Sequence, residues 1–377
     1  MTSPKTLHSR LSGNRSDQNT TATKARVALI SLRFRPAFVS HLVAFAKAFQ
    51  ELGLEVEFIV DLAYERFPDL KIIAPITPYS SLATANDYTY ALFANVSLRN
   101  QRLARQLKHG GTRILYLYHE PRHPSSTLAF FRDAGFYSGI FGSLAHVVSV
   151  SMLKLADRVI LPSKHAAAVY RQRDVRHNSA AFCVPLLFDD EARAVSTDKA
   201  VSRKYFSYVG AICHSHGFDH FLGFMRESFI KRWNIEFLIA SHHSLPPSVL
   251  RDPVIAANLD KIKVRCGRPL QNEEINRYYA ESFGIWNVYR TSMQSGVLPK
   301  AFMFGTPVVA SETGSFTEFV RDRVNGRFAL PADVEGIRAA VDDFRERTDT
   351  YAANCRTTFL ETFFYKANLS ELERVLK

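Results

Sequence analysis

The chain has little cysteine and no long hydrophobic run. Its four cysteines, Cys183, Cys213, Cys266 and Cys355, are scattered without a Cys-x-x-Cys pair, which argues against a disulfide framework and a cysteine-based zinc site. No apolar run reaches the roughly 18 residues that a membrane-spanning helix needs. The sequence also lacks an Asp-x-Asp pair in a metal-binding setting, so we expect an activity that does not depend on a metal.

The first 24 residues contain no apolar segment of the kind that a signal peptide needs. They have Ser, Thr, Asn and Lys instead. We therefore expect residues 1–24 to be a disordered tail. Together with the scattered cysteines, this predicts a cytoplasmic protein.

Positive charge is in excess, with a net charge of +12. The tail contributes 4 − 1 = +3 of this, which leaves 12 − 3 = +9 for the rest; its charged residues are Lys5, Arg10, Arg15, Lys24 and Asp17. Such a balance favours anionic partners, namely nucleotide sugars or a phospholipid surface. The basic residues are dispersed and form no recognisable nucleic-acid module, so we expect no nucleic-acid partner.

An aromatic stretch suggests where a membrane surface would be met. Phe130, Phe131, Phe136, Tyr137 and Phe141 lie close together, with two arginines near them. These rings suit either core packing, which the sequence favours, or contact with a lipid-linked acceptor beside an anionic headgroup. The second interpretation predicts a peripheral association with anionic membrane.

Apolar strands and amphipathic helices alternate in two series, which predicts an α/β protein with two Rossmann-like domains and parallel sheets. The first series begins with a buried strand at 27–32 and a helix from Val39, an opening that implies a right-handed crossover. We expect a first domain at 25–190, a polar linker at about 189–203, and a second domain at 204–357. A helix at 358–377 is expected to pack back on the first domain.

The most informative stretch runs from Gln294 to Glu318. A small-residue turn, Ser295-Gly296-Val297, precedes a short apolar helix that Pro299 would open and Gly305 would end. Unpaired amides at the start of that helix suit an anionic phosphate. The buried strand 307–310 then places its carboxyl end where ligands bind in α/β folds. An ordinary αβ unit without a ligand remains the alternative.

These features, in this order, resemble the GT-B glycosyltransferases, and more specifically the retaining group 1 family. The resemblance runs from about Arg26 to the C-terminus. It rests on His119 after a strand, the run from Ala156 to Ser163, Tyr208-Val209-Gly210 with its glycine turn, Cys266-Gly267, and the segment from Ser295 to Glu318. It implies two domains facing each other across a cleft, with an acceptor on the first and a nucleotide-diphosphate sugar on the second.

Two departures from the family pattern affect the expected donor site. Many members carry two glutamates eight positions apart, where this chain has Ser292 and Lys300, and the sequence resembles instead a subgroup that reads Gln-Ser-Gly-Val-x-Pro. Many members also clamp the diphosphate with Arg and Lys, where this chain has Ala211 and His216. Lys300 is a candidate to restore part of the missing positive charge.

The resemblance assigns the candidate site residues. His119 is expected near the hydroxyls of the donor sugar, and Glu120 beside it is a candidate contact for acceptor or sugar. The expected donor-binding residues are Gly210, His216, Gly217, Gly267, Arg268, Ser295, Gly296, Val297, Lys300 and Glu318. For His119, Glu120 and Glu318, a purely structural role is the alternative.

The implied function is retaining transfer of a sugar from a nucleotide-diphosphate sugar to a saccharide or lipid-linked saccharide, in surface polysaccharide biosynthesis. Such an enzyme chiefly stabilises a departing phosphate, which requires amides and cations and no cofactor. Two alternatives stay open. One is a catalytically inactive GT-B protein that binds a partner, and the other is a sugar-nucleotide epimerase, which would need a positioned acid/base pair.

Overall fold

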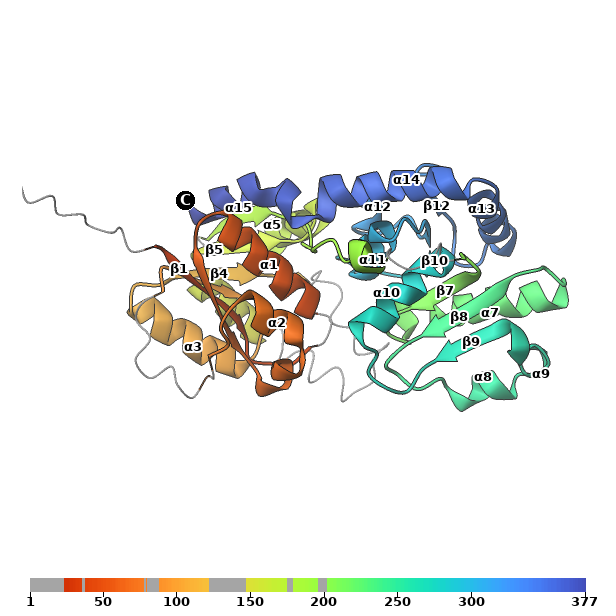
Figure 1. Ribbon diagram of the computed structural model, residues 1–377, viewed down its shortest axis with the longest axis horizontal. Helices are drawn as coiled ribbons and strands as arrows, with labels where there is room; N and C mark the ends of the chain where they lie inside the picture. The colour runs from red at the N-terminus through yellow and green to blue at the C-terminus, as the bar shows by residue number, and fades with distance from the viewer. Residues whose placement is uncertain are drawn as a thin grey trace, which may run out of the picture.

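The computed structural model describes residues 24–35, 38–77, 79, 88–121, 147–174, 179–195 and 202–377. The expected tail at 1–23 and the aromatic stretch around Phe130 to Phe141 lie outside these residues. Two α/β units stand side by side, and the C-terminal helices run along one side of both (Figure 1). In the described residues, no helix is long and apolar enough to cross a membrane.

The first unit contains a six-stranded parallel sheet in the order β2-β1-β3-β4-β5-β6. Its strands are β1 (Arg26–Ser31), β2 (Glu55–Val60), β3 (Tyr90–Phe93), β4 (Arg113–Leu117), β5 (Arg158–Leu161) and β6 (Ala180–Cys183). Alternate residues of β1 enter different cores: Val27 packs under α1 (Val39–Glu51), whereas Ala28 packs under α3 (Leu98–His109). A parallel sheet buried on both faces explains why its strands read as continuous apolar runs.

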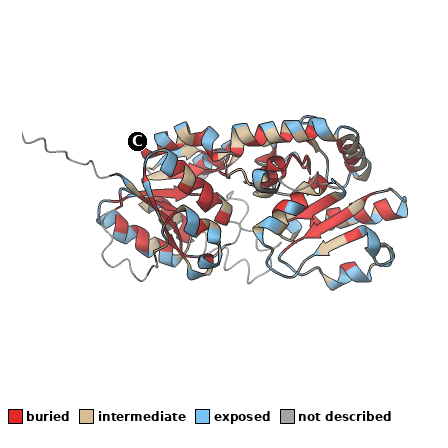
Figure 2. Cartoon of the chain, viewed as in Figure 1, coloured by how far each residue is buried: buried red, intermediate tan, exposed pale blue. Residues whose placement is uncertain are grey.

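The second unit repeats the architecture with the strand order β12-β11-β10-β7-β8-β9, again parallel throughout. Its strands are β7 (Tyr205–Val209), β8 (Glu236–Ala240), β9 (Ile262–Arg265), β10 (Ser282–Asn287), β11 (Val308–Ala310) and β12 (Gly326–Phe328). Every residue of β10, the strand between β7 and β11, is buried. Figure 2 shows both sheets as buried layers beneath partly exposed helices.

Helices cover both faces of each sheet. The other helices of the first unit are η2 (Leu62–Arg66), α2 (Pro68–Ile73) and α5 (Lys164–Asp174), and residues 147–155 are also helical. Those of the second unit include α6 (Ala192–Val195), η4 (His214–His216), α7 (Phe218–Ile230), α8 (Pro247–Arg251), α9 (Pro253–Ala256), η5 (Leu259–Lys261), α10 (Asn272–Ala280), α11 (Val297–Met303), α12 (Phe316–Phe319) and α13 (Val334–Glu346). Two Rossmann-like domains, as the sequence predicted, account for this arrangement.

The C-terminal segment returns to the first domain, but as several pieces rather than the single expected helix. Its elements are α14 (Thr348–Thr358), a π-helical turn η6 (Phe359–Phe363), η7 (Tyr365–Asn368) and α15 (Leu369–Leu376). The helical backbone stops at Phe364, which is extended and forms a β-bridge with Phe188. The chain therefore crosses between the domains twice, and the two crossings are hydrogen-bonded to each other.

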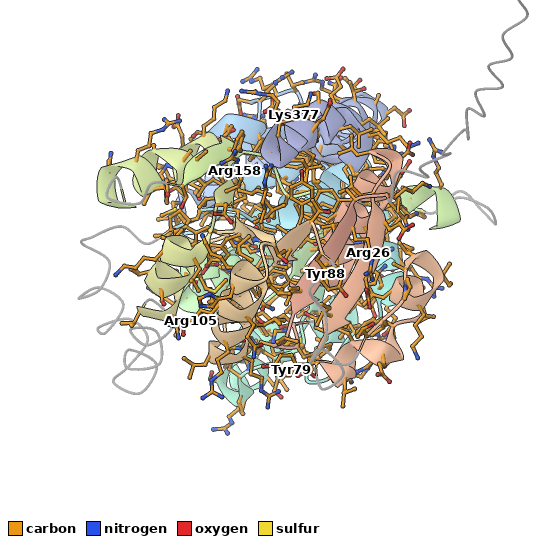
Figure 3. All side chains as sticks on the ribbon, turned by 90° about the vertical axis from the view of Figure 1, so that its left-hand side faces the viewer. Arg26, Tyr79, Tyr88, Arg105, Arg158 and Lys377 are labelled. Atoms are coloured by element: carbon orange, nitrogen blue, oxygen red, sulfur yellow. The ribbon has the colours of Figure 1, made fainter. Side chains whose placement is uncertain are left out.

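Side-chain contacts fasten α15 to the first domain. Leu372 and Val375 belong to the core that lies under α1, and Tyr90 donates a hydrogen bond to the Leu376 carbonyl at 2.9 Å. Seen from the end of the first domain, Lys377 and Arg158 both lie on its upper part (Figure 3). The predicted return of the C-terminus is thus observed in these contacts.

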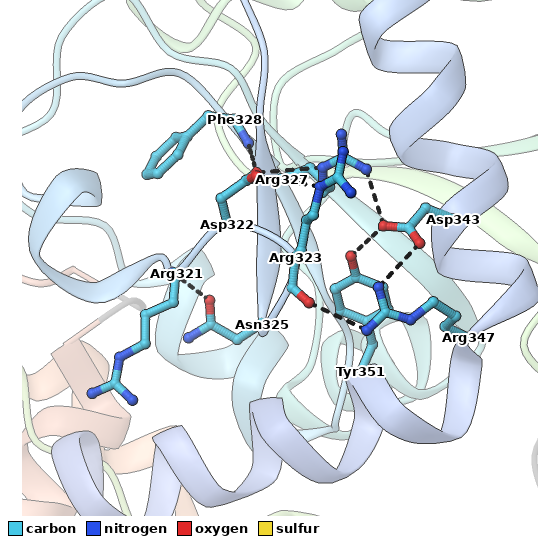
Figure 4. Close-up of polar contacts among 9 residues, drawn as sticks. All are labelled: Arg321, Asp322, Arg323, Asn325, Arg327, Phe328, Asp343, Arg347 and Tyr351. Atoms are coloured by element: carbon cyan, nitrogen blue, oxygen red, sulfur yellow. Dashed lines mark hydrogen bonds and ion pairs between the residues drawn. The ribbon is translucent and has the colours of Figure 1, made fainter.

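A polar network fixes the beginning of α14 on the second domain. The Asp343 carboxylate of α13 accepts hydrogen bonds from the Tyr351 hydroxyl at 2.5 Å and from Arg327 of β12 at 3.0 Å, and Arg347 joins it at 3.3 Å (Figure 4). Hydrogen bonds from Tyr351 and Arg327 outweigh burial and lower the pKa of Asp343. The network joins β12, α13 and α14, and so directs α14 along the side of the molecule.

The segment expected as the start of a polar linker is an interdomain clamp. Its three acids bind four different elements: Asp189 pairs with Lys47 of α1, Asp190 pairs with Arg356 of α14, and Glu191 binds residues of α10 and α11. The polarity of these residues thus reflects ion pairing between domains rather than exposure to solvent. Residues 196–201, the rest of the expected linker, lie outside the described part of the chain.

Glu191 is the centre of this clamp. One carboxylate oxygen accepts hydrogen bonds from the Lys300 ammonium and from Asn272 and Asn276 at 2.7 Å each. The other accepts from Ser40 of α1 at 3.0 Å. Burial favours the neutral acid, but the Lys300 charge and these hydrogen bonds outweigh it and lower the pKa of Glu191. A partly buried charge is thereby paired at the place where the domains meet.

We predict that Glu191→Gln destabilises the fold more than the double variant Glu191→Gln/Lys300→Met. The single change leaves the Lys300 ammonium, whose side chain is 8% exposed, without its counter-charge. Loss of one partner of a buried pair costs roughly 3–5 kcal/mol, whereas removal of both charges costs less. Equilibrium denaturant unfolding of the three proteins measures the difference.

The pH dependence of the free energy of unfolding provides the control. Because the pKa of Glu191 is lowered below its ordinary value of 4.5 in the folded state, its contribution is complete above that pH and is lost as pH falls through the folded pKa. The stability gap between wild type and Glu191→Gln should therefore shrink below about pH 4.5. A gap that stays constant from pH 7 to pH 3 would contradict the clamp.

Candidate functional site

Loops after the strands of the second sheet converge at its carboxyl edge. Gly210 follows β7 with φ +137°, and a Cβ built there would lie 3.5 Å from Val297 Cγ2. The loop after β7 and the turn before α11, far apart in sequence, are therefore in contact. This contact joins two of the predicted donor-binding segments.

Two glycines set the shape of these loops. Gly217 has φ +64°, and a Cβ there would meet the Val288 carbonyl oxygen at 2.2 Å. Gly314 has φ +55°, and its Cβ would lie 1.7 Å from the Ser292 carbonyl oxygen. Only glycine allows such close approach of backbone to backbone. Gly217 therefore holds the first loop against β10, and Gly314 holds the loop that leads into Ser295.

Tyr289 and Arg290, which follow β10, contact the segment that follows β7. The Tyr289 ring stacks on His216 with centroids 4.2 Å apart and planes 6° apart. Arg290 binds both carboxylate oxygens of Asp219, at 2.8 and 2.6 Å, and donates to the His214 carbonyl at 2.6 Å. Sequence reasoning missed this pair. Their position directly after the buried strand β10 was the available signal, because such positions face the ligand edge.

Unsatisfied polar atoms gather around this edge. Asn287, the last residue of β10, is fully buried, and neither amide atom has a hydrogen-bond partner in the described residues. The side-chain oxygen of Gln294 is likewise buried without a partner in these ranges. Buried polar groups are nearly always paired in native proteins. An unsatisfied amide at the carboxyl end of a central strand therefore identifies this edge as the candidate site.

The turn before α11 is open at Gly296, where the sequence predicts a small-residue turn that admits a phosphate. Gly296 has no atom within 4 Å of a built Cβ, and its φ of −71° suits any residue. The helix begins at Val297, two residues before the predicted start, so Pro299 occupies its third position. Gly305, with φ +65°, follows the end of the helix as expected.

Lys300 does not face this turn. Its ammonium binds Glu191 and the side-chain oxygens of Asn272 and Asn276, the latter two at 3.1 and 2.9 Å. The residue is 7% exposed. The idea that Lys300 replaces a missing phosphate clamp is thus corrected: its charge is used between the domains, because Glu191 offers a partly buried counter-charge.

Arg268 and Glu318 are also engaged elsewhere. Both terminal nitrogens of Arg268 bind Glu274, at 2.9 and 2.5 Å, so its side chain folds back on its own loop. Glu318 accepts a hydrogen bond at 2.7 Å from the Lys164 amide, at the start of α5 in the first domain. The carboxylate therefore faces the positive end of a helix in the other domain, rather than free space above the nucleotide site.

Gly267 remains beside the converging loops. It follows β9 with φ +85°, and its amide donates to the His243 carbonyl at 3.0 Å. The His243 ring in turn accepts from the Ile212 amide at 3.1 Å. This chain of contacts joins Gly267 to the Gly210 loop. The expected contact of Gly267 with the nucleobase stays a prediction.

His119 and Glu120 lie at the carboxyl edge of the first sheet, after β4. Both ring nitrogens of His119 are buried without a regular hydrogen bond to the described residues, and its ring packs edge-on against Phe38 at 4.6 Å. Burial and, to a smaller extent, the nearby His41 lower the pKa of His119 to about 3. His119 is therefore neutral at physiological pH. Glu120 is exposed.

The two edges face the same interface. Ser163, just before α5 in the first domain, donates to the Met293 carbonyl at 3.0 Å. Met293 precedes the Gln294-Ser295-Gly296 turn, so the carboxyl edge of the first sheet touches the loop that forms the candidate donor site. No group of three metal-binding side chains is present within the described ranges.

The comparisons agree with this geometry. Residues 203–346, almost the whole second domain, match the family model described as "Glycosyl transferases group 1". No curated protein matches the chain. The match falls on the domain that carries the Gly210, Gly217 and Ser295 loops.

Solved structures match both domains. Sucrose-phosphate synthase from Thermosynechococcus elongatus is 15% identical, with a TM-score of 0.65 and coverage of 93% of this chain and 98% of that one. Anabaena Alr3699/HepE, solved in complex with UDP and with UDP-glucose, is 14% identical, with a TM-score of 0.68 and coverage of 93% and 99%. A putative UDP-N-acetylglucosamine 2-epimerase from Listeria monocytogenes is 12% identical, with a TM-score of 0.58 and coverage of 93% and 95%.

At identities of 12–15%, the similarity to these solved structures establishes the fold, which is GT-B. The family model covers less than half of the chain, and it likens the second domain to the group 1 glycosyl transferases.

We predict that Gly314→Ala disturbs the donor loop, whereas Gly111→Ala does not. Both glycines have positive φ, +55° and +87°, so both substitutions incur a similar backbone cost of about 1–2 kcal/mol. Only at Gly314 does the new Cβ meet backbone, and displacement of Ser292 should cost about 1–3 kcal/mol more. Thermal unfolding with and without UDP measures both effects. Equal losses of stability and of UDP response in the two variants would contradict this assignment.

Proposed function

We propose that the protein is a metal-independent, retaining glycosyltransferase that moves a sugar from a nucleotide-diphosphate sugar to a saccharide or lipid-linked saccharide. Its place in surface polysaccharide biosynthesis and at the cytoplasmic face of an anionic membrane is part of the same proposal. The observation that carries it is the convergence of the Gly210, Gly217 and Ser295 loops at one sheet edge, within the segment that matches group 1 glycosyl transferases. The UDP and UDP-glucose complexes of the similarly folded Alr3699/HepE support a nucleotide-sugar donor.

We place the donor diphosphate over the turn Ser295-Gly296-Val297. The first amides of a helix have no partner within the helix, and they point toward this turn. The helix α11 has seven residues, so its dipole is small and the amides themselves supply most of the attraction. Because Lys300 and Arg268 are engaged elsewhere, the backbone replaces the side-chain clamp found in many members of the family.

The proposed chemistry needs no strong protein base. In a retaining transfer the departing diphosphate can accept the acceptor proton on the same face of the sugar. The protein then chiefly stabilises charge on the leaving group and holds the sugar in place. His119, which is neutral because its pKa is about 3, suits a hydrogen bond to a sugar hydroxyl and does not suit proton transfer near neutral pH.

An inactive binding protein is the second candidate, because position 300 is occupied by a lysine that binds Glu191. Release of free sugar from a nucleotide sugar in the absence of acceptor would contradict it. An epimerase is less well supported, since Glu318 binds the Lys164 amide and forms no pair with another carboxylate in the described residues. Thermal-shift screening with nucleotide sugars selects the donor: a ligand at a hundred times its Kd stabilises by about 2.7 kcal/mol.

We predict that Gly296→Val abolishes nucleotide binding without unfolding the protein. Two methyl groups would lie over the turn where the diphosphate is placed, and the position has no neighbour within 4 Å to clash with. UDP affinity should fall at least tenfold and sugar transfer by orders of magnitude. Gly223→Val is the matched control, since Gly223 is also free of neighbours but lies on the exposed side of α7. Wild-type UDP affinity in Gly296→Val would show that the site is misplaced.

We predict that His119→Gln lowers turnover more than UDP affinity. The residue belongs to the domain opposite the expected nucleotide and is assigned to the sugar. Removal of one hydrogen bond to the reacting sugar should lower kcat about 10- to 100-fold and change the UDP Kd less than threefold. The pH dependence of the wild-type rate should also contain no step from protonation of His119 between pH 5 and pH 8. A matching loss in UDP affinity would place His119 at the nucleotide instead.

A further inference from the structure

Two arginines at the carboxyl edge of the first sheet have no counter-ion in contact among the described residues. Arg33 and Arg35 follow β1 directly, and both residues are exposed. No ion pair joins either guanidinium to an acid among the residues that the structure describes. Arg66, after β2, adds a third cation nearby, with its guanidinium 4.8 Å from the centre of the Phe34 ring.

A buried polar network holds the backbone that carries these arginines. The Tyr64 hydroxyl accepts a hydrogen bond from the Arg35 amide at 3.1 Å and lies 2.9 Å from Ser31 Oγ. The Asn95 amide group donates to the Arg33 carbonyl at 2.9 Å and to Ser31 Oγ at 2.7 Å. Ser31 and Tyr64 are fully buried, and Asn95 is 7% exposed.

The network continues into α3. Asn100, which is fully buried, donates to the Asn95 backbone and side-chain oxygens at 2.7 and 2.8 Å and accepts from the Leu32 amide at 3.1 Å. Buried networks in which each member is paired rigidify the segment that they hold. The loop 31–35 is therefore preorganised, although no ion pair joins either of its two arginine side chains to the part of the chain that the structure describes.

The charge on Arg35 is poorly compensated. Partial enclosure by protein is the largest cause that lowers its pKa, and repulsion by Arg33 is the next. Glu120 acts in the opposite direction, but the pKa remains below the ordinary value. Arg33 and Arg35 repel each other on a rigid loop. Binding of an anion to both guanidinium groups is therefore favoured.

The position of Arg33 and Arg35 indicates which substrate supplies the anion. Arg35 lies close enough to His119 to influence its pKa, so the pair belongs to the same edge as the residue assigned to the sugar. The loops assigned to the donor diphosphate belong to the other domain. An oxyanion bound by Arg33 and Arg35 therefore comes most directly from the acceptor.

We propose that Arg33 and Arg35 form an oxyanion-binding site for the acceptor, and hence that the acceptor carries a phosphate or a carboxylate near the hydroxyl that receives the sugar. This inference rests on the proposed function and narrows it, since the acceptor class becomes an anionic saccharide or a phosphate-linked one. Planar guanidinium groups bind both kinds of oxyanion with paired hydrogen bonds.

The test is titration of the full-length protein with inorganic phosphate in the presence of saturating UDP. UDP fills the diphosphate site, so further binding of phosphate reports a second site. Thermal unfolding is followed at constant ionic strength, with chloride balancing the phosphate, and sodium glucuronate is titrated in parallel as a carboxylate probe. We expect saturable stabilisation by at least one probe, with an apparent affinity that is at least fivefold weaker in Arg33→Gln/Arg35→Gln.

Two further variants separate the site from general charge and from folding. Arg105→Gln removes an exposed arginine on α3, on the outer part of the first domain (Figure 3), and should change the affinity less than twofold. Tyr64→Phe keeps both arginines but removes the hydroxyl that holds the Arg35 amide, and should weaken binding about threefold. Loss of binding in Arg105→Gln equal to that in the double variant would overturn the proposal.

The UDP titration distinguishes the remaining outcomes. If wild-type protein does not bind UDP, the proposed function fails before this inference is tested. If UDP binds but neither probe gives an arginine-dependent response, the inference fails and the proposed function stands. If the double variant loses more than fivefold in UDP affinity, the arginines bind the donor diphosphate, and the assignment to the acceptor is wrong.

Discussion

The ion pair between the partly buried Glu191 and the buried Lys300 is the contact on which the arrangement of the two domains depends. Lys300 lies on α11, the helix that carries the donor turn at its start, and Glu191 lies on the segment that leaves the first domain. Ser40 of α1 binds the same carboxylate. The pair therefore connects the donor turn to the first domain through one buried and one partly buried charge, and each charge satisfies the other. The second crossing, where Phe364 bridges to Phe188, reinforces the same junction.

Much of the fold could be predicted from the sequence. Continuous apolar runs such as 27–32 and 284–288 are typical of strands buried on both faces, and their alternation with amphipathic helices indicated two parallel sheets. Gly305 marked the end of α11 because a helix that ends in a left-handed residue favours glycine. Gly210 and Gly217 were assigned to the site, and both have positive φ at the expected sheet edge.

The parts that could not be predicted depend on contacts between distant residues. The acids at 189–191 had the composition of a linker, and only the fold shows that each has a basic partner 109 or more positions away along the chain. Lys300 was a candidate to restore part of the positive charge of the missing clamp, but the carboxylate of Glu191 binds it instead. The hydrogen bond from the Lys164 backbone amide to Glu318, 154 positions apart, is a contact of the same kind, which a local pattern does not encode.

The central claim is that the nucleotide diphosphate binds the backbone at the carboxyl edge of the second sheet. Hydrogen–deuterium exchange of the full chain with and without UDP tests it most directly, because the amides themselves are observed. The account predicts slower exchange with UDP in two segments, residues 210–217 and 294–298, while the first-domain strands β1 to β4 stay unchanged. Protection that is confined to the first domain, or that is absent from both segments when UDP is saturating, would contradict it.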